Sequence, residues 1–274
     1  MLNSLSSAVT GLDSFQQDMD VIGNNIANIN TDGFKAGMVN FADTFSDTLV
    51  NGTGAVQVGT GVYDQAITNN WNQGAVNATG ISTDLAISGN GFFVVQDPTT
   101  SNQYVTQDGS FSINAGGYLV TAGGQQVLGS NNGSSTLGPI QINAAGAPST
   151  AAPDATVSSF NINAQGQINV TLSDGTVFTR AQVMLQDFQD PQALLSQGGN
   201  LYSNQANAGP IQTAPSAPGS GELGQIQSGY VEISNVDLST EMANLITAQR
   251  GFEANSKVVT TSDQLLQTLV NMVH

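Results

Sequence analysis

The sequence contains no cysteine, and its single histidine is the last residue, His274. Zinc sites and the Cys/His or Ser/His/Asp systems of nucleophilic enzymes therefore lack their parts. Basic residues are scarce as well: four Lys and Arg stand against 20 Asp and Glu, so the formal net charge is -16. Binding to a phosphate backbone needs Lys and Arg side chains that displace counterions, so this composition excludes a nucleic-acid partner.

Long apolar runs are also missing. No run approaches the roughly 18 apolar residues of a membrane span, so we expect no membrane insertion. No basic residue precedes Lys35, whereas a secretory leader begins with a basic segment. By these signals the chain neither spans a membrane nor is exported by a cleaved leader. Charged residues make up only 9% of its 274 residues, so amides, hydroxyls and backbone must cover its surface.

Both ends of the chain carry an apolar residue at every seventh position. These residues are Leu5, Leu12, Met19, Ile26, Leu245, Phe252, Val259, Leu266 and Val273. Such a repeat predicts two helices that pair with each other as a left-handed coiled coil. We assign the second position of the C-terminal repeat to Gln249, Ser256 and Asp263, where a strong zipper would carry Leu. The pair should therefore be unstable as an isolated two-stranded coil.

Between the two helical ends, the hydrophobic pattern changes to a period of two with frequent turn signals, which is typical of antiparallel strands. Segments 84–87 and 92–95 flank the turn Ser88-Gly89-Asn90-Gly91, and we expect them to form a hairpin. Residues 168–172 alternate, and Asp174-Gly175 returns the chain into 177–179 as a second hairpin. The predicted fold class is α+β, with terminal helices and a β-rich middle.

The predicted domains follow from these patterns. They are a helical domain of 1–30 with 235–274, a connecting segment of 31–70 and a β-rich domain of 71–234. Within the β-rich domain, segments 130–154 and 203–221 are rich in Gly, Ala, Ser, Thr or Pro. We expect both to be flexible joints that bury little apolar surface.

No pattern of residues indicates catalysis. Gly219, Gly221 and Gly224 spell G-x-G-x-x-G, but a Pro/Ser-rich segment precedes them instead of a strand, so we interpret them as a flexible loop. Close carboxylate pairs occur at Asp18 with Asp20, Asp43 with Asp47, and Asp187 with Asp190. We interpret them as solvated groups of turns and helix faces. We therefore predict no catalytic residue, no cofactor and no metal site.

Four asparagines crowd the end of the first predicted helix: Asn24, Asn25, Asn28 and Asn30. Capping and turn formation explain amides at the helix end. They do not explain the asparagines that lie within the helix before its end, because Asn is a poor helix former.

Two long runs carry a family resemblance. Residues 12–35 and 228–271 closely resemble the bacterial flagellar rod and hook axial proteins, and 83–97 and 103–124 look like the β-domain of that family. The family motif falls on Asn24, Asn25, Asn28, Thr31, Gly33, Phe34, Lys35, Ser234, Asn235, Val236, Gln249 and Arg250. The resemblance implies a structural subunit of the hook or basal body rather than an enzyme, with terminal helices that form the inner tube of a helical filament.

The resemblance also implies partners. They are other copies of the chain in a torque-transmitting helical polymer, adjacent rod, hook or junction proteins, a hook-cap or rod-cap protein, and the flagellar type III export apparatus. Subunits of this family are exported without leader cleavage. Phe41 and Phe45, within F-A-D-T-F, match the hydrophobic export signal of rod and hook subunits. The alternative is that both are ordinary core aromatics.

Which family member this chain resembles depends on two opposed features. The compact connection from Lys35 to Val62 is typical of a hook protein, whereas distal rod proteins carry extra residues there. The overall length favours the rod, because hook proteins usually insert a second outer domain where this chain has only 130–154. We favour a short hook subunit, with distal rod protein as the alternative. A secreted β-rich glycan-processing enzyme or an acidic adhesin is more remote, since neither needs matching heptads at both termini.

Overall fold

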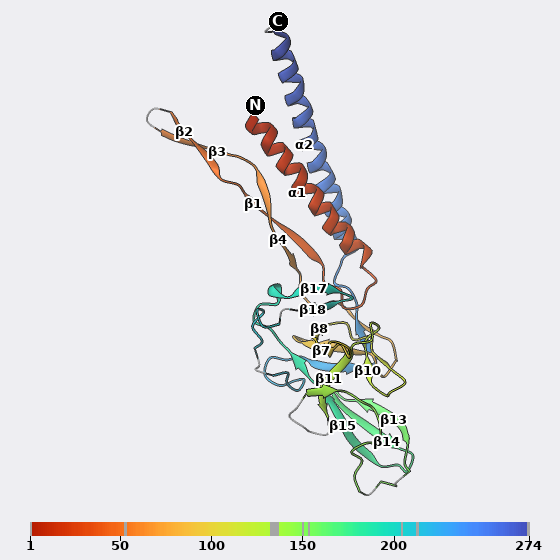
Figure 1. The fold of residues 1–274 in the computed structure, drawn as a ribbon. Coiled ribbons are helices and arrows are strands. Elements are labelled where there is room, and N and C mark those ends of the chain that lie inside the picture. The colour runs from red at the N-terminus through yellow and green to blue at the C-terminus, as the bar shows by residue number, and fades with distance from the viewer. Residues whose placement is uncertain are drawn as a thin grey trace. The chain divides into compact units, whose positions relative to one another are not determined.

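The structure is a computed structural model, and its elements are labelled in Figure 1. It describes residues 2–51, 54–131, 137–149, 151–152, 154–203, 205–211 and 214–272. The chain divides into two compact units, which do not follow the predicted boundaries. Unit 1 comprises residues 1–29, 35–70 and 236–274, and unit 2 comprises 30–34 and 71–235. Most of the segment that we expected to be a connection, 31–70, therefore belongs with the terminal helices.

Unit 1 contains two helices and two β-ribbons. Its elements are α1 (Leu2–Ala27), β1 (Gly37–Asp43), β2 (Ser46–Asn51), β3 (Gly54–Gly59), β4 (Val62–Asn69) and α2 (Leu238–Met272). Strand β1 pairs antiparallel with β4, and β2 pairs antiparallel with β3. Asp237 directly precedes α2, and its Oδ1 accepts a hydrogen bond from the backbone N–H of Thr240 at 2.9 Å. This cap satisfies a donor that would otherwise be unpaired at the helix start.

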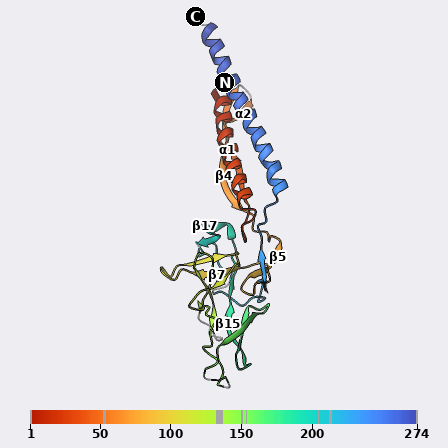
Figure 2. The same cartoon turned by 90° about the vertical axis from the view of Figure 1, so that its right-hand side faces the viewer.

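Helices α1 and α2 pack side by side and run in opposite directions (Figure 2). Two glycines allow their close approach. A Cβ on Gly11 would lie 2.5 Å from Nδ2 of Asn255, and a Cβ on Gly251 would lie 2.4 Å from the ring of Phe15. The contact therefore moves from Gly11 to Phe15 on α1 while it moves from Asn255 back to Gly251 on α2, as expected of antiparallel helices.

The buried positions of α2 differ from the predicted second position of the repeat. Leu245, Phe252, Val259 and Leu266 are half-buried, as expected of one row of the seam. Ala248 is only 1% exposed and Ser262 is also buried, whereas Gln249 and Asp263 are exposed and Ser256 is half-buried. The second row therefore follows the first by three residues instead of four, and it carries small side chains that bring the helices close together.

The buried positions of α1 also differ from the predicted heptad positions. Leu5, Leu12, Met19 and Ile26 are only half-buried. The most buried side chains of this helix lie on other positions, namely Ala8, Ser14, Ile22 and Asn25. Helix α1 also contacts β1 and β4, so its burial is divided between two neighbours. Val273, the last predicted heptad residue, lies outside the described residues.

Unit 2 is β-rich. Its strands are β5 (Val76–Ala78), β6 (Leu85–Ser88), β7 (Phe92–Gln96), β8 (Gln103–Thr106), β9 (Ser112–Ile113), β10 (Leu119–Val120), β11 (Gln126–Asn131), β12 (Leu137–Pro139), β13 (Val157–Ile162), β14 (Gln167–Leu172), β15 (Val177–Val183), β16 (Leu185–Gln186), β17 (Leu195–Gly198), β18 (Leu201–Ser203), β19 (Gln225–Ser228) and β20 (Tyr230–Glu232). A 3-10 turn spans Pro191–Ala193. The main sheet follows the order β13-β14-β15-β11-β7-β8-β18-β17, and β6 with β19 and β5 with β20 form two-stranded sheets. All strand pairs are antiparallel, so the coarse α+β prediction is confirmed.

One predicted hairpin forms and the other does not. Strands β14 and β15 pair as expected, with Val170 opposite Phe178. Segments 84–87 and 92–95 do not pair with each other, because β6 pairs with β19 and β7 pairs with β8. The loop between them binds elsewhere: the backbone N–H of Gly224 donates to the carbonyl of Asn90 at 2.7 Å. The loop 88–91 is thus held against the segment before β19 instead of forming a hairpin turn.

Several segments of unit 2 bury more than the sequence predicts. Ile140 and Ile142 belong to the main core and Ala208 to a second core cluster, so 130–154 and 203–221 do bury apolar side chains. Asp187 is buried as well, so the interpretation of its pair as solvated is wrong there. Its Oδ1 accepts a hydrogen bond from the N–H of Phe188 at 2.8 Å, and burial raises the pKa of its carboxyl group.

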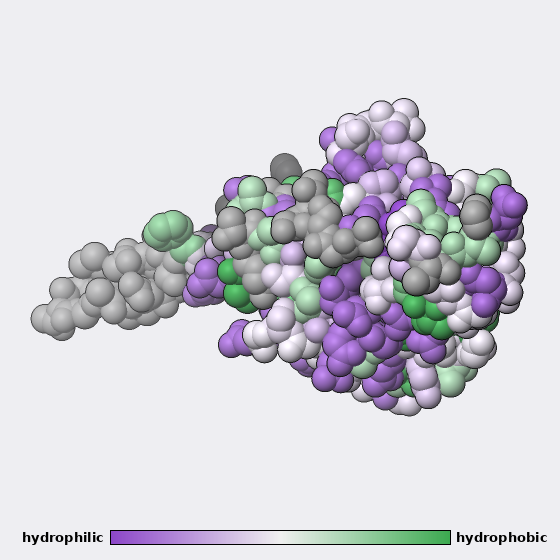
Figure 3. All heavy atoms as spheres, turned by 90° about the horizontal axis from the view of Figure 1, so that it is seen from below, coloured by the Kyte–Doolittle hydropathy of each residue, from purple (hydrophilic) through white to green (hydrophobic). Residues whose placement is uncertain are grey.

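The face drawn in Figure 3 is mostly hydrophilic or neutral, and its apolar residues form small separate patches. A surface of this kind agrees with the low content of charged residues. Neither described helix is long and apolar enough to cross a membrane.

Candidate functional site

Helix α2 exposes a series of large apolar side chains. They are Leu238, Met242, Ile246, Val258, Leu265, Leu269, Val270 and Met272. Exposed apolar side chains of this number on one helix are unusual for a surface in permanent contact with water. These exposed side chains of α2 are therefore the strongest candidate for a contact with another chain.

The two helices also differ in length. Helix α1 has 26 residues and α2 has 35. The helices are antiparallel and Gly11 lies against Asn255, so residues before Gly11 match residues after Asn255 one for one. The start of α1 therefore falls opposite about residue 264 of α2. The described residues of α1 do not extend along the last two turns of α2. These turns carry Leu265 and Leu269, both more than half exposed.

Asn25 explains why the amides of the motif begin before the helix end. Its side chain is 1% exposed and makes two hydrogen bonds to one residue of β1. Oδ1 accepts from the N–H of Gly37 at 2.9 Å, and Nδ2 donates to the carbonyl of Gly37 at 2.8 Å. Asn28 has the expected local role, because its Nδ2 donates to the carbonyl of Asn24 at 2.9 Å. Asn25 thus fastens the start of β1 to α1.

The next motif residues lie in unit 2 and bring the two halves of the motif together. The N–H of Gly33 donates to the carbonyl of Glu232 at 2.7 Å, and the N–H of Asn235 donates to the carbonyl of Phe34 at 3.4 Å. Gly33 has a φ of +69°, and a Cβ there would lie 2.6 Å from the backbone nitrogen of Asp108. Only glycine fits this position without a shift of the backbone.

The other motif residues fall into two groups. Ser234 in unit 2 is buried, as are Lys35 and Val236 in unit 1, and the carbonyl of Thr31 accepts from the N–H of Phe34 at 3.3 Å. Gln249 and Arg250 are exposed on α2. Arg250 forms an ion pair with Glu253 at 3.0 Å, and an exposed pair of this kind adds little stability.

The two aromatic residues of the expected export signal have different surroundings. Phe41 on β1 is 42% exposed, and its ring centroid lies 6.4 Å from that of Phe15. Phe45 is 96% exposed. The interpretation of Phe45 as a core aromatic is therefore wrong for this chain, whereas Phe41 packs in part.

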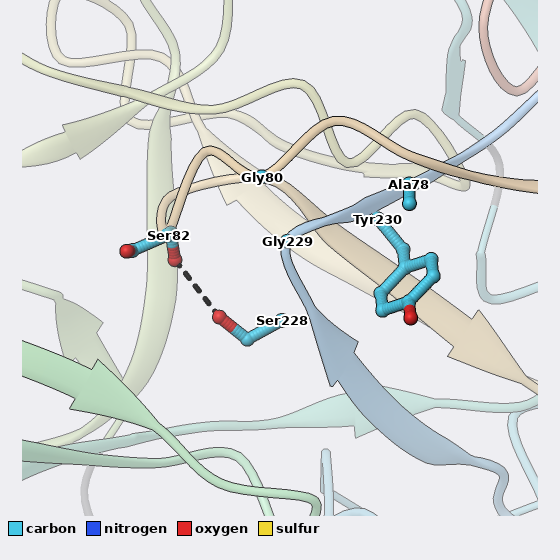
Figure 4. A pocket seen from close by; sticks show the side chains of 6 residues that line it. All are labelled: Ala78, Gly80, Ser82, Ser228, Gly229 and Tyr230. Carbon is cyan, nitrogen blue, oxygen red and sulfur yellow. Dashed lines mark hydrogen bonds between the residues drawn. The ribbon is translucent and has the colours of Figure 1, made fainter.

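No arrangement suited to catalysis was found among the described residues. They contain no group of three or more Asp, Glu, His or Cys that could hold a metal ion. A pocket of about 290 Å³ in unit 2 is lined by Ala78, Gly80, Ser82, Ser228, Gly229 and Tyr230 (Figure 4). Its hydroxyl groups include Ser228, whose Oγ donates to the carbonyl of Ser82 at 3.1 Å. The lining offers neither a carboxylate pair nor a base beside a nucleophile.

Three family models match this chain. Residues 5–35 match the flagella basal body rod protein, 86–170 match the flagellar hook protein FlgE/F/G D1 domain, and 227–272 match the flagellar basal body rod FlgEFG protein C-terminal. A Bacillus subtilis protein named flagellar basal-body rod protein FlgG is 38% identical over 281 residues, which cover 99% of both chains. The chain belongs to the bacterial flagellar rod and hook protein family.

Two further relatives are a rod protein and a hook protein. A flagellar basal-body rod protein FlgG of Buchnera aphidicola is 38% identical and covers 98% of this chain and 99% of its own length. A flagellar hook protein FlgE of Borreliella burgdorferi is 24% identical in an alignment of 444 residues, which covers 99% of this chain and all of the relative. The family inferred from the terminal motifs is thus confirmed, and the chain is a structural subunit of the flagellar rod or hook, not an enzyme.

Proposed function

We propose that this chain is a subunit of the flagellar rod, corresponding to the distal rod protein, and not of the hook. The support is the pattern of relatives. Those named as rod proteins match end to end at up to 38% identity with an alignment of 281 residues. The hook relative needs an alignment of 444 residues against a chain of 274, so it contains long segments that this chain lacks. The comparisons thus favour the rod over the short hook subunit that we preferred from the sequence.

Copies of the chain join through the exposed apolar side chains of α2 into a helical tube that transmits torque. The observation that carries this proposal is the uncovered apolar series on α2, which continues past the start of α1. Contacts between identical subunits that do not close on themselves grow a helical polymer. Burial of these side chains against a neighbouring copy would supply the driving force.

The α1–α2 pair is a short coiled coil in this proposal. Its support is the alternation of three and four residues between Leu245, Ala248, Phe252 and Asn255, which is the spacing of a heptad seam. Adjacent rod or hook proteins, a junction protein, a cap protein and the type III export apparatus are the further partners that we infer from the family. Phe41 and Phe45 are the residues that we expect the export apparatus to read.

Assembly can be tested with two double variants of equal charge. Leu265→Asp with Leu269→Asp places two carboxylates among the exposed apolar side chains of α2, and burial of an unpaired charge costs several kcal/mol. Gln264→Asp with Thr268→Asp adds the same charges at neighbouring exposed polar positions and serves as the control. We expect electron microscopy to find polymers of the control and none of the leucine variant, with both proteins folded. Normal polymers of the leucine variant would overturn the proposed contact.

The choice between rod and hook needs a separate test. Electron microscopy of basal bodies from a strain that lacks this chain should find an incomplete rod. A complete rod with a missing hook would instead assign the chain to the hook.

A further inference from the structure

The sequence of unit 2 contains a single basic residue. Arg180 lies on β15, and every other charged residue of unit 2 is Asp or Glu. Arg180 is only 9% exposed, which is unusual for an arginine unless a carboxylate is paired with it. Within the described part of the chain, however, no carboxylate forms an ion pair with it. A charge that is withdrawn from water without a counter-charge is costly, so this arrangement favours the binding of an anion.

A β-bulge determines where this side chain lies. On β14, Ile168 lies opposite Ala181 and Asn169 lies opposite Thr179, so Arg180 is the additional residue of β15 and has no partner on β14. Ala181 belongs to the main core, whereas Thr179 is exposed. Bulges redirect a side chain and are frequent next to functional sites. The bulge therefore removes Arg180 from the regular alternation between core and solvent.

One side of the guanidinium group of Arg180 is fixed by the protein. Its Nε donates to Oδ1 of Asn143 at 2.9 Å, and the same oxygen accepts from the N–H of Ala145 at 3.1 Å. The two Nη groups donate to no described residue, and neither is among the buried side-chain nitrogens that lack a partner. Both Nη groups therefore reach the surface, although most of the side chain is covered.

We propose that the two Nη groups of Arg180 bind a carboxylate group in a bidentate manner. A guanidinium group presents parallel N–H bonds that match the two oxygens of a carboxylate. The hydrogen bond from Nε to Asn143 fixes the orientation of this group in advance, so little side-chain freedom is lost on binding. A carboxylate would also supply the counter-charge that the described residues of unit 2 do not offer.

The carboxylate has two possible sources. One is an Asp or Glu of another copy, because the chain carries 20 acidic residues against four Lys and Arg and its copies polymerise in the proposed function. The other is a small free carboxylate. Only the first source rests on the proposed function, and binding of a free carboxylate by the unpolymerised chain is independent of it.

Carbon-13 labelling of arginine gives a direct test, because the chain has only two arginines, Arg180 and Arg250. The full-length, unpolymerised chain therefore gives two Cζ signals in an NMR spectrum, and Arg250→Lys assigns them. Sodium acetate replaces sodium chloride stepwise at constant ionic strength and about pH 7, where acetate is ionised. Arg250 is the internal control, since it is exposed and already paired with Glu253 at 3.0 Å.

We expect the Cζ signal of Arg180 to shift and to saturate, with half of the change at about 10–100 mM acetate, while the signal of Arg250 changes little. No shift of the Arg180 signal, or equal and unsaturated shifts of both signals, would overturn the proposal. Arg180 would then be a packed side chain whose charge only faces water. The titration needs no variant of Arg180, so it holds even if Arg180 is required for folding, and its failure would leave the proposed contact on α2 intact.

A second measurement distinguishes the two sources. Arg180→Lys keeps the charge but loses the bidentate geometry, and Val177→Ala, at an exposed residue of the same strand, is the control. If another copy supplies the carboxylate, Arg180→Lys should raise the protein concentration at which polymers form about fivefold, and Val177→Ala should not. Unchanged polymerisation of Arg180→Lys, together with saturable binding of acetate, would reject a neighbouring copy as the source and assign the site to a free carboxylate.

Discussion

The two units of this chain bury different kinds of side chain. In unit 2, large apolar residues such as Phe93, Leu85 and Leu119 are completely buried. In unit 1, the buried helix positions include the small residues Ala8 and Ala248, while α2 leaves most of its large apolar side chains exposed. Unit 2 thus completes a core within the chain. Unit 1 leaves apolar side chains of α2 exposed, as expected of a subunit that polymerises.

The difference can be measured because each unit has its own spectroscopic signal. Trp71 is the only tryptophan, and it belongs to unit 2. Its ring packs edge-on against Phe92 and Tyr202, with centroids 5.3 Å and 5.1 Å away. Tryptophan fluorescence therefore reports on unit 2, and helical circular dichroism reports on unit 1.

The largest effect is expected from a truncation in the core of unit 2. Phe93 is fully buried, and its ring packs edge-on against Phe111 at 5.1 Å. Phe93→Ala should lower the free energy of unfolding by about 3–5 kcal/mol, because it leaves a cavity. Urea unfolding followed by the fluorescence of Trp71 measures the loss. Val177→Ala, at a residue 60% exposed, is the control and should change stability by less than about 0.5 kcal/mol.

A smaller loss is expected at the glycine of the family motif. Gly33→Ala introduces a Cβ at a positive φ and 2.6 Å from the backbone of Asp108. We expect a loss of about 1–3 kcal/mol in the fluorescence transition of unit 2. Gly175→Ala is a matched control, because Gly175 also has a positive φ but nothing lies within 4 Å of its Cβ. Equal losses for both variants would mean that backbone strain alone makes Gly33 necessary.

The sequence predicts the helices of unit 1 well and their seam only in part. The period of seven is visible because large apolar residues such as Leu245 and Phe252 repeat. The second row of the seam consists of Ala248, Asn255 and Ser262, which no hydrophobic pattern distinguishes from solvent-facing residues. Small side chains are placed there because the helices approach closely, and that distance is a property of the pair rather than of either helix.

In unit 2, the hairpin of β14 and β15 is predictable because a tight turn at Asp174-Gly175 joins strands that are adjacent in sequence. The pairing of β6 with β19 is not, since these strands come from Leu85–Ser88 and Gln225–Ser228 and no local turn connects them. The same limit applies to Ile140 and Ile142: their segment has the composition of a loop, but it packs against a core built by distant strands.

The candidate site was also predictable from the sequence only in part. The motif residues could be identified from the sequence, but the role of Asn25 depends on the backbone of Gly37, which the chain brings near only after it turns. Asp18 and Asp20 look alike in the sequence, and only the packed structure separates the half-buried carboxyl from the exposed one.

A gain in stability is expected from a glycine of α1. Gly23 is exposed within the helix, and nothing lies within 4 Å of its Cβ. Gly23→Ala should stabilise the helical transition of unit 1 by about 0.5–1 kcal/mol, because alanine is the better helix former. Gly11→Ala should not give this gain, because the new Cβ would collide with the side chain of Asn255. A gain of equal size for Gly11→Ala would show that the two helices are not closely packed in the free chain.

The smallest change in stability is expected at Phe45, although its effect on export could be large. Because Phe45 is 96% exposed, Phe45→Ala should alter the free energy of unfolding by less than about 0.5 kcal/mol. Phe41→Ala removes a partial contact with Phe15 and should cost about 0.5–1.5 kcal/mol. If the export apparatus reads both aromatic rings, the double variant should fail to reach the culture medium while the purified protein still folds and polymerises. Secretion at the wild-type level would reject the export role, and a loss of several kcal/mol would mean that both rings support folding instead.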